Sequence, residues 1–149
     1  MKTSDAPITL GRCLLAGLLT GIVAAVIVIV FNVIYRGAMH FIAFAVVMPI
    51  SIFMAFPFFH LIAGGFYFLF IDHLRKGSML FTVISLLLTA IAVLVTLYAG
   101  DRSDPTIEAF RGLLVGLEII GGVLAAFLTP FLVRHPTLFL TAEDIKGEE

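Results

Sequence analysis

The chain has 149 residues, of which 61% are hydrophobic and only 13% charged, and its mean hydropathy is +1.16. Soluble domains are about half apolar and a quarter charged, so this composition predicts an integral membrane protein. The formal net charge is −1 and the nine Lys and Arg residues are scattered, so no basic surface is expected and nucleic acid is not a predicted partner.

Four mostly apolar stretches are long enough to cross a bilayer. A spanning helix needs about 20 apolar residues to cross about 30 Å of hydrocarbon. The flanking charges place the predicted spans at about residues 13–35, 50–71, 77–99 and 111–133. The expected fold is an all-α integral membrane protein, in which residues 1–149 form one bundle of four transmembrane helices.

The first predicted span follows Lys2 and Arg12, as the apolar run of a signal peptide would. Its run is longer than that of a signal peptide, and no small-residue cleavage pattern follows it before Arg36. We therefore expect an uncleaved membrane anchor.

The uncharged run between Gly37 and Ile71 is too long for one ordinary span and too short for two. Pro49 divides it, because proline lacks a backbone N–H and disfavours helix at the residue before it. We predict that segment 37–48, GAMHFIAFAVVM, forms a short apolar interfacial or partly re-entrant helix. The alternative is one long tilted helix, kinked at Pro49 and also at Pro57.

The stretch before the fourth span contains Asp104 and Thr106, either of which can cap a helix start, with Glu108 near its positive end. These residues lack the glycine turn and terminal Glu of a calcium-binding loop, so no metal site is predicted. After the fourth span we expect an acidic, solvated tail over residues 134–149.

The Lys and Arg residues on the two sides of the predicted bundle indicate its orientation. With the amino terminus inside, the outer face carries three, namely Arg36, Arg102 and Arg111, and the inner face carries the other six. The positive-inside rule then predicts a multi-pass protein of the cell (inner) membrane with both termini in the cytoplasm.

Polar side chains within predicted spans are costly in lipid, so they are candidate functional residues. Glu118 and His60 lie about 10 and 15 Å below the outer ends of their spans, and Thr89 reaches a similar depth. We hypothesise an intramembrane polar site of His60, Glu118, Thr89 and Asn32 that binds a proton, a cation or a polar headgroup. In a purely structural interpretation, Glu118 is protonated or reaches toward Arg111, and His60 hydrogen-bonds a backbone carbonyl.

Small residues four positions apart let helix backbones approach closely. This spacing predicts helix packing at five glycines, Gly17, Gly21, Gly64, Gly112 and Gly116. We expect these contacts within one subunit, with contacts between subunits as the alternative.

The cluster DHLRK, residues 72–76, follows the second span. Arg75 and Lys76 are predicted to contact lipid headgroups at the inner face. The competing hypothesis is a lipid-modifying enzyme with its site around His73.

The sequence lacks the parts of several enzyme classes. Cys13 is the single cysteine, so neither an intrachain disulfide nor a C-x-x-C redox pair is possible. The sequence also contains no nucleophile elbow, no phosphate-binding glycine loop and no histidine pair at metal-ligand spacing, so we predict no cofactor and no metal.

The expected function is that of a non-enzymatic channel or transport component, or of an accessory subunit of a membrane assembly. Its expected partners are the lipid bilayer and either further copies of the chain or another membrane subunit. The transport alternative is a proton-coupled carrier that uses Glu118 and His60.

Overall fold

The structure of the chain is a computed structural model, which describes residues 8–40, 48–99 and 105–138. The described residues are helical and contain no strand, as predicted. Their long helices are each long and apolar enough to cross a membrane, which supports a multi-pass membrane protein. In chain order the elements are α1 (Leu10–Met39), α2 (Pro49–His73), α3 (Gly77–Tyr98), α4 (Pro105–Arg134) and the short 3-10 helix η2 (Pro136–Leu138).

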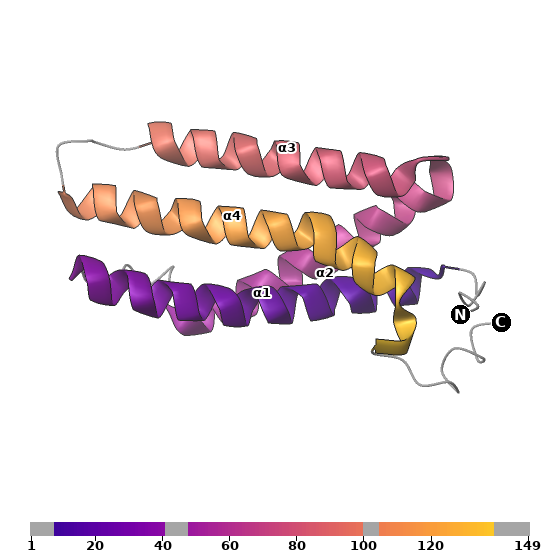
Figure 1. The fold of residues 1–149 in the computed structure, drawn as a ribbon, viewed down its shortest axis with the longest axis horizontal. Coiled ribbons are helices and arrows are strands. Elements are labelled where there is room, and N and C mark those ends of the chain that lie inside the picture. Colours follow the sequence, from indigo (N-terminus) through magenta and orange to yellow (C-terminus); the bar gives the residue numbers. More distant parts are fainter. Residues whose placement is uncertain (1–7, 41–47, 100–104, 139–149) are drawn as a thin grey trace.

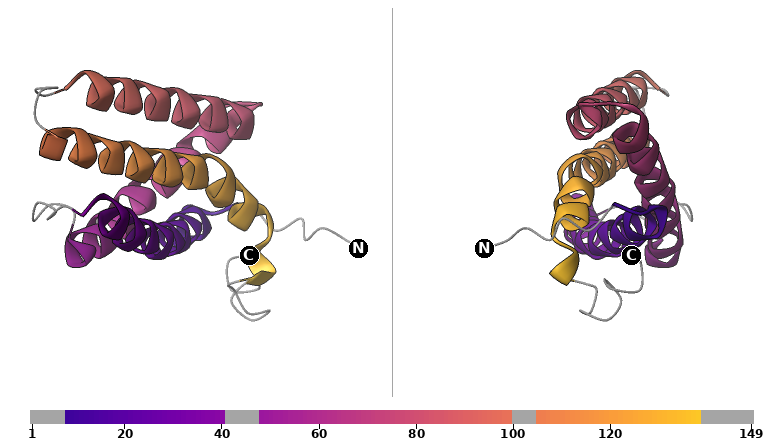
Figure 2. Two further views of the ribbon diagram at one scale, coloured as in Figure 1. Left: turned by 60° about the vertical axis from the view of Figure 1, so that its left-hand side comes forward. Right: turned by 90° about the vertical axis from the view of Figure 1, so that its right-hand side faces the viewer.

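Three of the helices lie roughly side by side, with α4 between α1 and α3 (Figure 1). The helix α2 runs obliquely behind them, from the end of α1 to the start of α3 (Figure 1). Two further views show the same crossing (Figure 2). The beginning of α1 and the end of α4 therefore lie at the same end of the bundle, together with the turn between α2 and α3.

The structure changes the predicted division between the first two helices. Residues 37–39, which the sequence assigned to an interfacial helix, continue α1, because a glycine inside a helix costs only about 1 kcal/mol and Gly37 does not end it. The helix ends at His40, whose φ of 53° is left-handed and whose backbone N–H donates to the Arg36 carbonyl. The rest of the predicted interfacial segment, residues 41–47, lies outside the described residues.

A helix begins at Pro49, as the sequence predicted, with Met48 in extended conformation before it. Proline suits the first helical position, since its missing N–H would have no helical acceptor there. The same argument explains α4, which begins at Pro105, six residues before the predicted span. Asp104, a predicted cap, and residues 139–149 of the predicted tail lie outside the described residues.

A proline inside α4 accounts for one contact between α3 and α4. Pro130 has no N–H, so the Ala126 carbonyl lacks its normal helical donor. The Thr82 hydroxyl on α3 lies 3.0 Å from this oxygen and donates to it. A neighbouring helix thus satisfies the carbonyl that the proline left open, as membrane interiors require.

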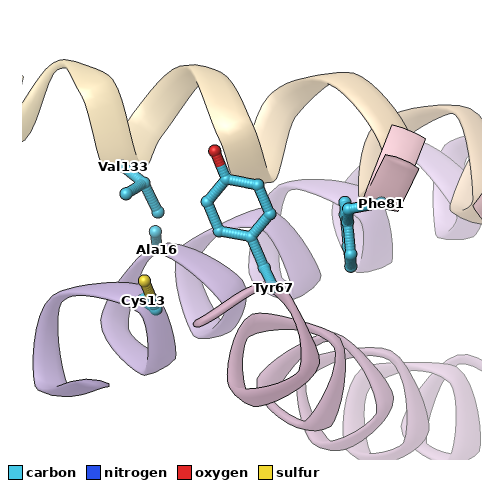
Figure 3. Packing of buried hydrophobic residues seen from close by; sticks show 5 residues of the cluster. All are labelled: Cys13, Ala16, Tyr67, Phe81 and Val133. Atoms are coloured by element: carbon cyan, nitrogen blue, oxygen red, sulfur yellow. The ribbon is translucent and has the colours of Figure 1, made fainter. Parts of the chain in front are cut away.

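The core consists of two clusters along the bundle axis. Val28, Ile52, Leu113 and Leu117 form the cluster nearer the end of α1. The cluster nearer its beginning contains Tyr67 and Phe81, whose rings meet edge to face with centroids 5.0 Å apart, and it includes Cys13, Ala16 and Val133 (Figure 3). Large apolar side chains on the outer faces of the helices remain exposed, which suits contact with lipid.

The backbones of α1 and α2 approach each other closely where they cross. A Cβ at Gly17 would collide with the His60 carbonyl oxygen, and one at Gly64 would collide with the Cys13 carbonyl oxygen. Gly21 lies equally tightly against the backbone of Pro57. Only glycine fits these positions, so the crossing of α1 and α2 depends on them.

Candidate functional site

A cavity of about 530 Å³ lies between α2, α3 and α4. Three of the four residues of the hypothesised polar site, His60, Thr89 and Glu118, line it. The fourth, Asn32, is fully buried on α1 and does not line the cavity. The remaining lining residues are apolar or glycine: Ala55, Phe56, Phe59, Leu88, Ala92, Leu114, Leu117, Gly121 and Gly122.

The cavity follows from the oblique path of α2. A short turn joins the end of α2 to the start of α3. With distance from this turn the two helices diverge, because α2 lies obliquely across the bundle toward α1 while α3 stays beside α4 (Figure 1). The space between the two diverging helices is closed on one side by α4. Phe59 and Leu88 lie in its wall and are also 65% and 60% exposed, so the cavity opens sideways, toward the apolar surface of the bundle.

Two glycines of α4 form part of the cavity wall. A Cβ at Gly122 would collide with the Thr89 hydroxyl, and one at Gly121 would lie 2.8 Å from the Phe56 ring. Nearer the start of α4, Gly112 and Gly116 receive the side chains of Tyr35 and Phe31 from α1 in the same way. These four glycines on α4 therefore accommodate side chains, whereas Gly17, Gly21 and Gly64 allow close contact between the backbones of α1 and α2.

Glu118 lies in the middle of α4, with about 20 Å of helix before it and about 24 Å after it. The Thr96 hydroxyl donates to its Oε1 at 2.6 Å. Its Oε2 is buried and has no hydrogen-bond partner in the described part of the chain. Arg111 does not take this role, because its Nη2 donates to the Ala99 carbonyl oxygen at 2.9 Å.

His60 links α2 to α4. Its Nδ1 lies 2.8 Å from the Phe56 carbonyl oxygen and its Nε2 lies 3.2 Å from the Gly121 carbonyl oxygen. The side chain is 6% exposed, and its ring stacks on Phe56 with centroids 5.8 Å apart. A neutral imidazole has one N–H, so it donates to one of these oxygens at a time. This geometry is the one the structural interpretation expected of His60.

Within the described residues, no ion pair or hydrogen bond joins Glu118 to His60. The Thr89 hydroxyl does not donate to the carboxylate, because it donates to the Ser85 carbonyl oxygen at 2.8 Å. The three residues share a cavity without forming a hydrogen-bonded network.

The sequence reasoning missed Thr96, although a signal for it exists. Hydroxyl residues recur on α3 at intervals of three, four and seven, which places them on one helical face: Ser78, Thr82, Ser85, Thr89 and Thr96. The contacts of Thr82 with Ala126, of Thr89 with Gly122 and of Thr96 with Glu118 show that this face meets α4. A hydroxyl stripe on an otherwise apolar span predicts its packing face.

The cluster of residues 72–76 surrounds a second hollow of about 480 Å³, open to the surface. Asp72 and His73 lie 3.5 Å apart and are 58% and 68% exposed. Arg75 and Lys76 line the hollow, as does Arg134, which donates to the Ser78 hydroxyl at 2.8 Å. The sequence reasoning did not bring Arg134 to this cluster, because it belongs to a different helix.

Metal binding finds no support within the described ranges, where no group of three His, Cys, Asp or Glu side chains could hold an ion. Comparisons of the chain with protein-family models, with curated proteins and with solved structures give no significant match.

Proposed function

We propose that this chain is a non-enzymatic transport component of a cell membrane, whose ligand occupies the cavity between α2, α3 and α4. The observation that carries this proposal is that Glu118, whose buried Oε2 has no hydrogen-bond partner among the described residues, lines an apolar cavity of about 530 Å³. Small-molecule sites have this size and this combination of apolar walls with few polar groups. An ionisable group kept deep in a membrane helix is costly without a function.

The polar groups of the cavity support binding rather than catalysis. The His60 ring faces two backbone carbonyls and the Thr89 hydroxyl donates to a third, so neither is positioned as a base or nucleophile toward the other. The exposed Asp72–His73 pair, around which a lipid-modifying enzyme was hypothesised, lies outside the cavity.

A proton-coupled carrier is the second candidate. The observation that favours it is that Glu118 and His60 line the same cavity. In such a carrier Glu118 would exchange a proton for the ligand, and the rate of transport would depend on a proton gradient across the membrane.

The test compares ligand content and transport in three proteins. Ala92→Phe places a ring in the cavity, whereas Val95→Phe places the same ring on an exposed position of α3 as a matched control. Each protein is isolated in native lipid discs, and its bound small molecules are identified by mass spectrometry. Proteoliposomes loaded with the identified molecule then report its release.

We expect the wild type and Val95→Phe to retain one small molecule that Ala92→Phe lacks, and to release it faster than protein-free vesicles. Equal small-molecule content in all three proteins would overturn the proposed binding cavity. Binding without accelerated release would instead support an accessory subunit. A release rate that rises with an imposed proton gradient would favour the carrier.

A further inference from the structure

We propose that the cavity between α2, α3 and α4 is a binding site for a lipophilic cation, a molecule with an apolar or aromatic body and one ammonium group. This inference rests on the proposed ligand-binding function and adds the chemical class of the ligand. It is argued from the hydrogen bonds and charges of the residues that line the cavity.

The first step concerns the polar atoms of the cavity. His60 and Thr89 direct their N–H and O–H groups to backbone carbonyls. Glu118 differs, because its Oε2 is buried and lacks a hydrogen-bond partner among the described residues. Glu118 is therefore the lining residue that keeps an unmade hydrogen bond among the described residues, and its Oε2 is an acceptor when the carboxylate is ionised.

The second step concerns orientation. The hydroxyl of Thr96, on α3, donates to Oε1 of Glu118 at 2.6 Å, and this hydrogen bond restricts rotation of the carboxylate. A charged acceptor that is fixed before the ligand arrives loses less conformational entropy on binding. Thr96 is thus a positioning residue for Glu118.

The third step concerns charge. The described residues that line the cavity include no Lys or Arg, and none forms an ion pair with Glu118. An ammonium group would neutralise the carboxylate and donate the missing hydrogen bond at once, and such charge-assisted bonds are among the strongest in proteins. An anionic ligand, such as a fatty acid, would instead face an uncompensated like charge.

The fourth step concerns the body of the ligand. Phe56 and Phe59 line the cavity on the α2 side, and the sideways opening lies at the apolar surface of the bundle. Aromatic faces attract cations as well as apolar groups. A ligand that first partitions into the bilayer could enter directly from the lipid, which favours a lipophilic cation over a water-soluble one.

The experiment uses three probes with one aromatic body and different head groups: 1-pyrenemethylammonium, 1-pyrenemethanol and 1-pyrenecarboxylate. Native mass spectrometry of the full-length protein in detergent counts the bound probe molecules over a range of concentrations. Glu118→Gln keeps the shape of the side chain and removes its charge. Glu108→Gln removes the same charge from an exposed position on the same helix and is the matched control.

We expect the wild type and Glu108→Gln to bind one ammonium probe, at least about tenfold more tightly than the alcohol, and the carboxylate more weakly still. Glu118→Gln should lose this preference and bind ammonium and alcohol within about threefold of each other. Thr96→Val, which keeps the charge but frees the carboxylate, should weaken ammonium binding by about threefold to tenfold. This second variant keeps the inference testable should Glu118→Gln fail to fold.

Several outcomes would overturn the inference. They are equal binding of the three probes to the wild type, tight ammonium binding by Glu118→Gln, and no binding of any probe. Alcohol binding that Ala92→Phe abolishes, without a preference for ammonium, would leave the cavity as a binding site and remove only the cation. Glu118-dependent ammonium binding without accelerated release would support this inference and contradict the transport function.

Discussion

Two ionisable side chains share one cavity, yet their hydrogen bonds differ. Both ring nitrogens of His60 face backbone carbonyls, one on its own helix and one on α4. Glu118 has one oxygen held by Thr96 and the other without a partner within the described residues. A histidine bonded in this way holds helices together, whereas a half-bonded carboxylate is available to a ligand.

The structural role of His60 gives the first prediction. His60→Leu removes the hydrogen bond between α2 and the Gly121 carbonyl and puts an apolar side chain of similar size in the place of the imidazole. That carbonyl retains its helical donor, so we expect a loss of about 1 kcal/mol in the free energy of unfolding. Thermal unfolding in detergent measures this loss.

His73→Leu is the matched control for this variant. Its ring also faces a carbonyl four residues earlier on α2, that of Leu69, but it is 68% exposed, and within the described residues its nitrogens bond to no other helix. We expect its stability to equal that of the wild type. Equal stability of both variants would mean that the bond to Gly121 contributes nothing.

For single residues, the sequence predicted the level of a side chain along its helix but not the side of the helix to which it points. The rise of 1.5 Å per residue placed His60, Thr89 and Glu118 at comparable levels, and all three line one cavity. The rotation of each helix decides which of these groups touch, and it follows from packing of the whole bundle. The sequence reasoning therefore missed the bond from Thr96 to Glu118 and included Asn32, which lies away from the cavity.

Among the elements, the pair α3 and α4 is joined through hydroxyl groups. Thr82 donates to the Ala126 carbonyl, which lacks a helical donor because of Pro130. Thr82→Val should lower the stability of the wild type by about 1–2 kcal/mol, since it leaves this buried carbonyl without a donor. Pro130→Ala restores the helical donor.

A double-mutant cycle isolates this coupling. In the Pro130→Ala background, Thr82→Val should lower the free energy of unfolding by at least about 1 kcal/mol less than it does in the wild type. Unfolding of the wild type, the two single variants and the double variant measures this difference. Additive effects of the two substitutions would contradict the proposed relation between the proline and the threonine.

The crossing of α1 and α2 gives a prediction with a built-in control, because Gly64 and Gly65 are adjacent. A Cβ at Gly64 would collide with the Cys13 carbonyl oxygen, whereas one at Gly65 would meet only the Leu14 side chain at an ordinary 3.6 Å. Gly64→Ala should destabilise the fold by about 1–3 kcal/mol through overpacking. Gly65→Ala should be neutral or stabilising by up to about 1 kcal/mol, because alanine favours helix. Unfolding midpoints of the two variants that coincide would show that the backbones can separate without cost.

Helix boundaries were predictable where a residue blocks the helix and not elsewhere. Pro49 begins α2 because proline fits the first turn, and this rule was available from the sequence. Gly37 does not end α1, since glycine weakens a helix without blocking it. Arg111, which marked the start of the predicted fourth span, lies inside α4, and this helix begins at Pro105, beside the predicted caps Asp104 and Thr106.

For the whole molecule, hydropathy indicates the number of membrane-length helices, because a backbone in lipid must satisfy its hydrogen bonds within each helix. It does not indicate their arrangement. The oblique path of α2 creates the cavity, and it depends on where Gly17, Gly21 and Gly64 allow close approach to α1. These glycines could be identified in the sequence, but the angle at which α1 and α2 cross could not.

The orientation of the bundle in the membrane gives the last prediction. The start of α1, the turn between α2 and α3 and the end of α4 lie at one end of the bundle (Figure 1). This end includes Arg12, Arg75, Lys76 and Arg134, whereas Arg36 and Arg111 lie toward the other end. The positive-inside rule therefore predicts that the end with more Lys and Arg faces the cytoplasm.

A reporter that is active only in the cytoplasm should then work when it is fused after Glu149 and fail when it is fused after Ser103. A second reporter, active only outside the cytoplasm, should give the reverse pattern and control for expression. Changing Arg75 and Lys76 to Gln removes two of the charges that set the orientation, so the difference between the fusion sites should narrow. Cytoplasmic activity after Ser103 in the wild type would mean that the bundle is inserted the other way round. The cavity opens sideways to lipid in either orientation, so that result would reverse the direction of transport and leave the binding site unchanged.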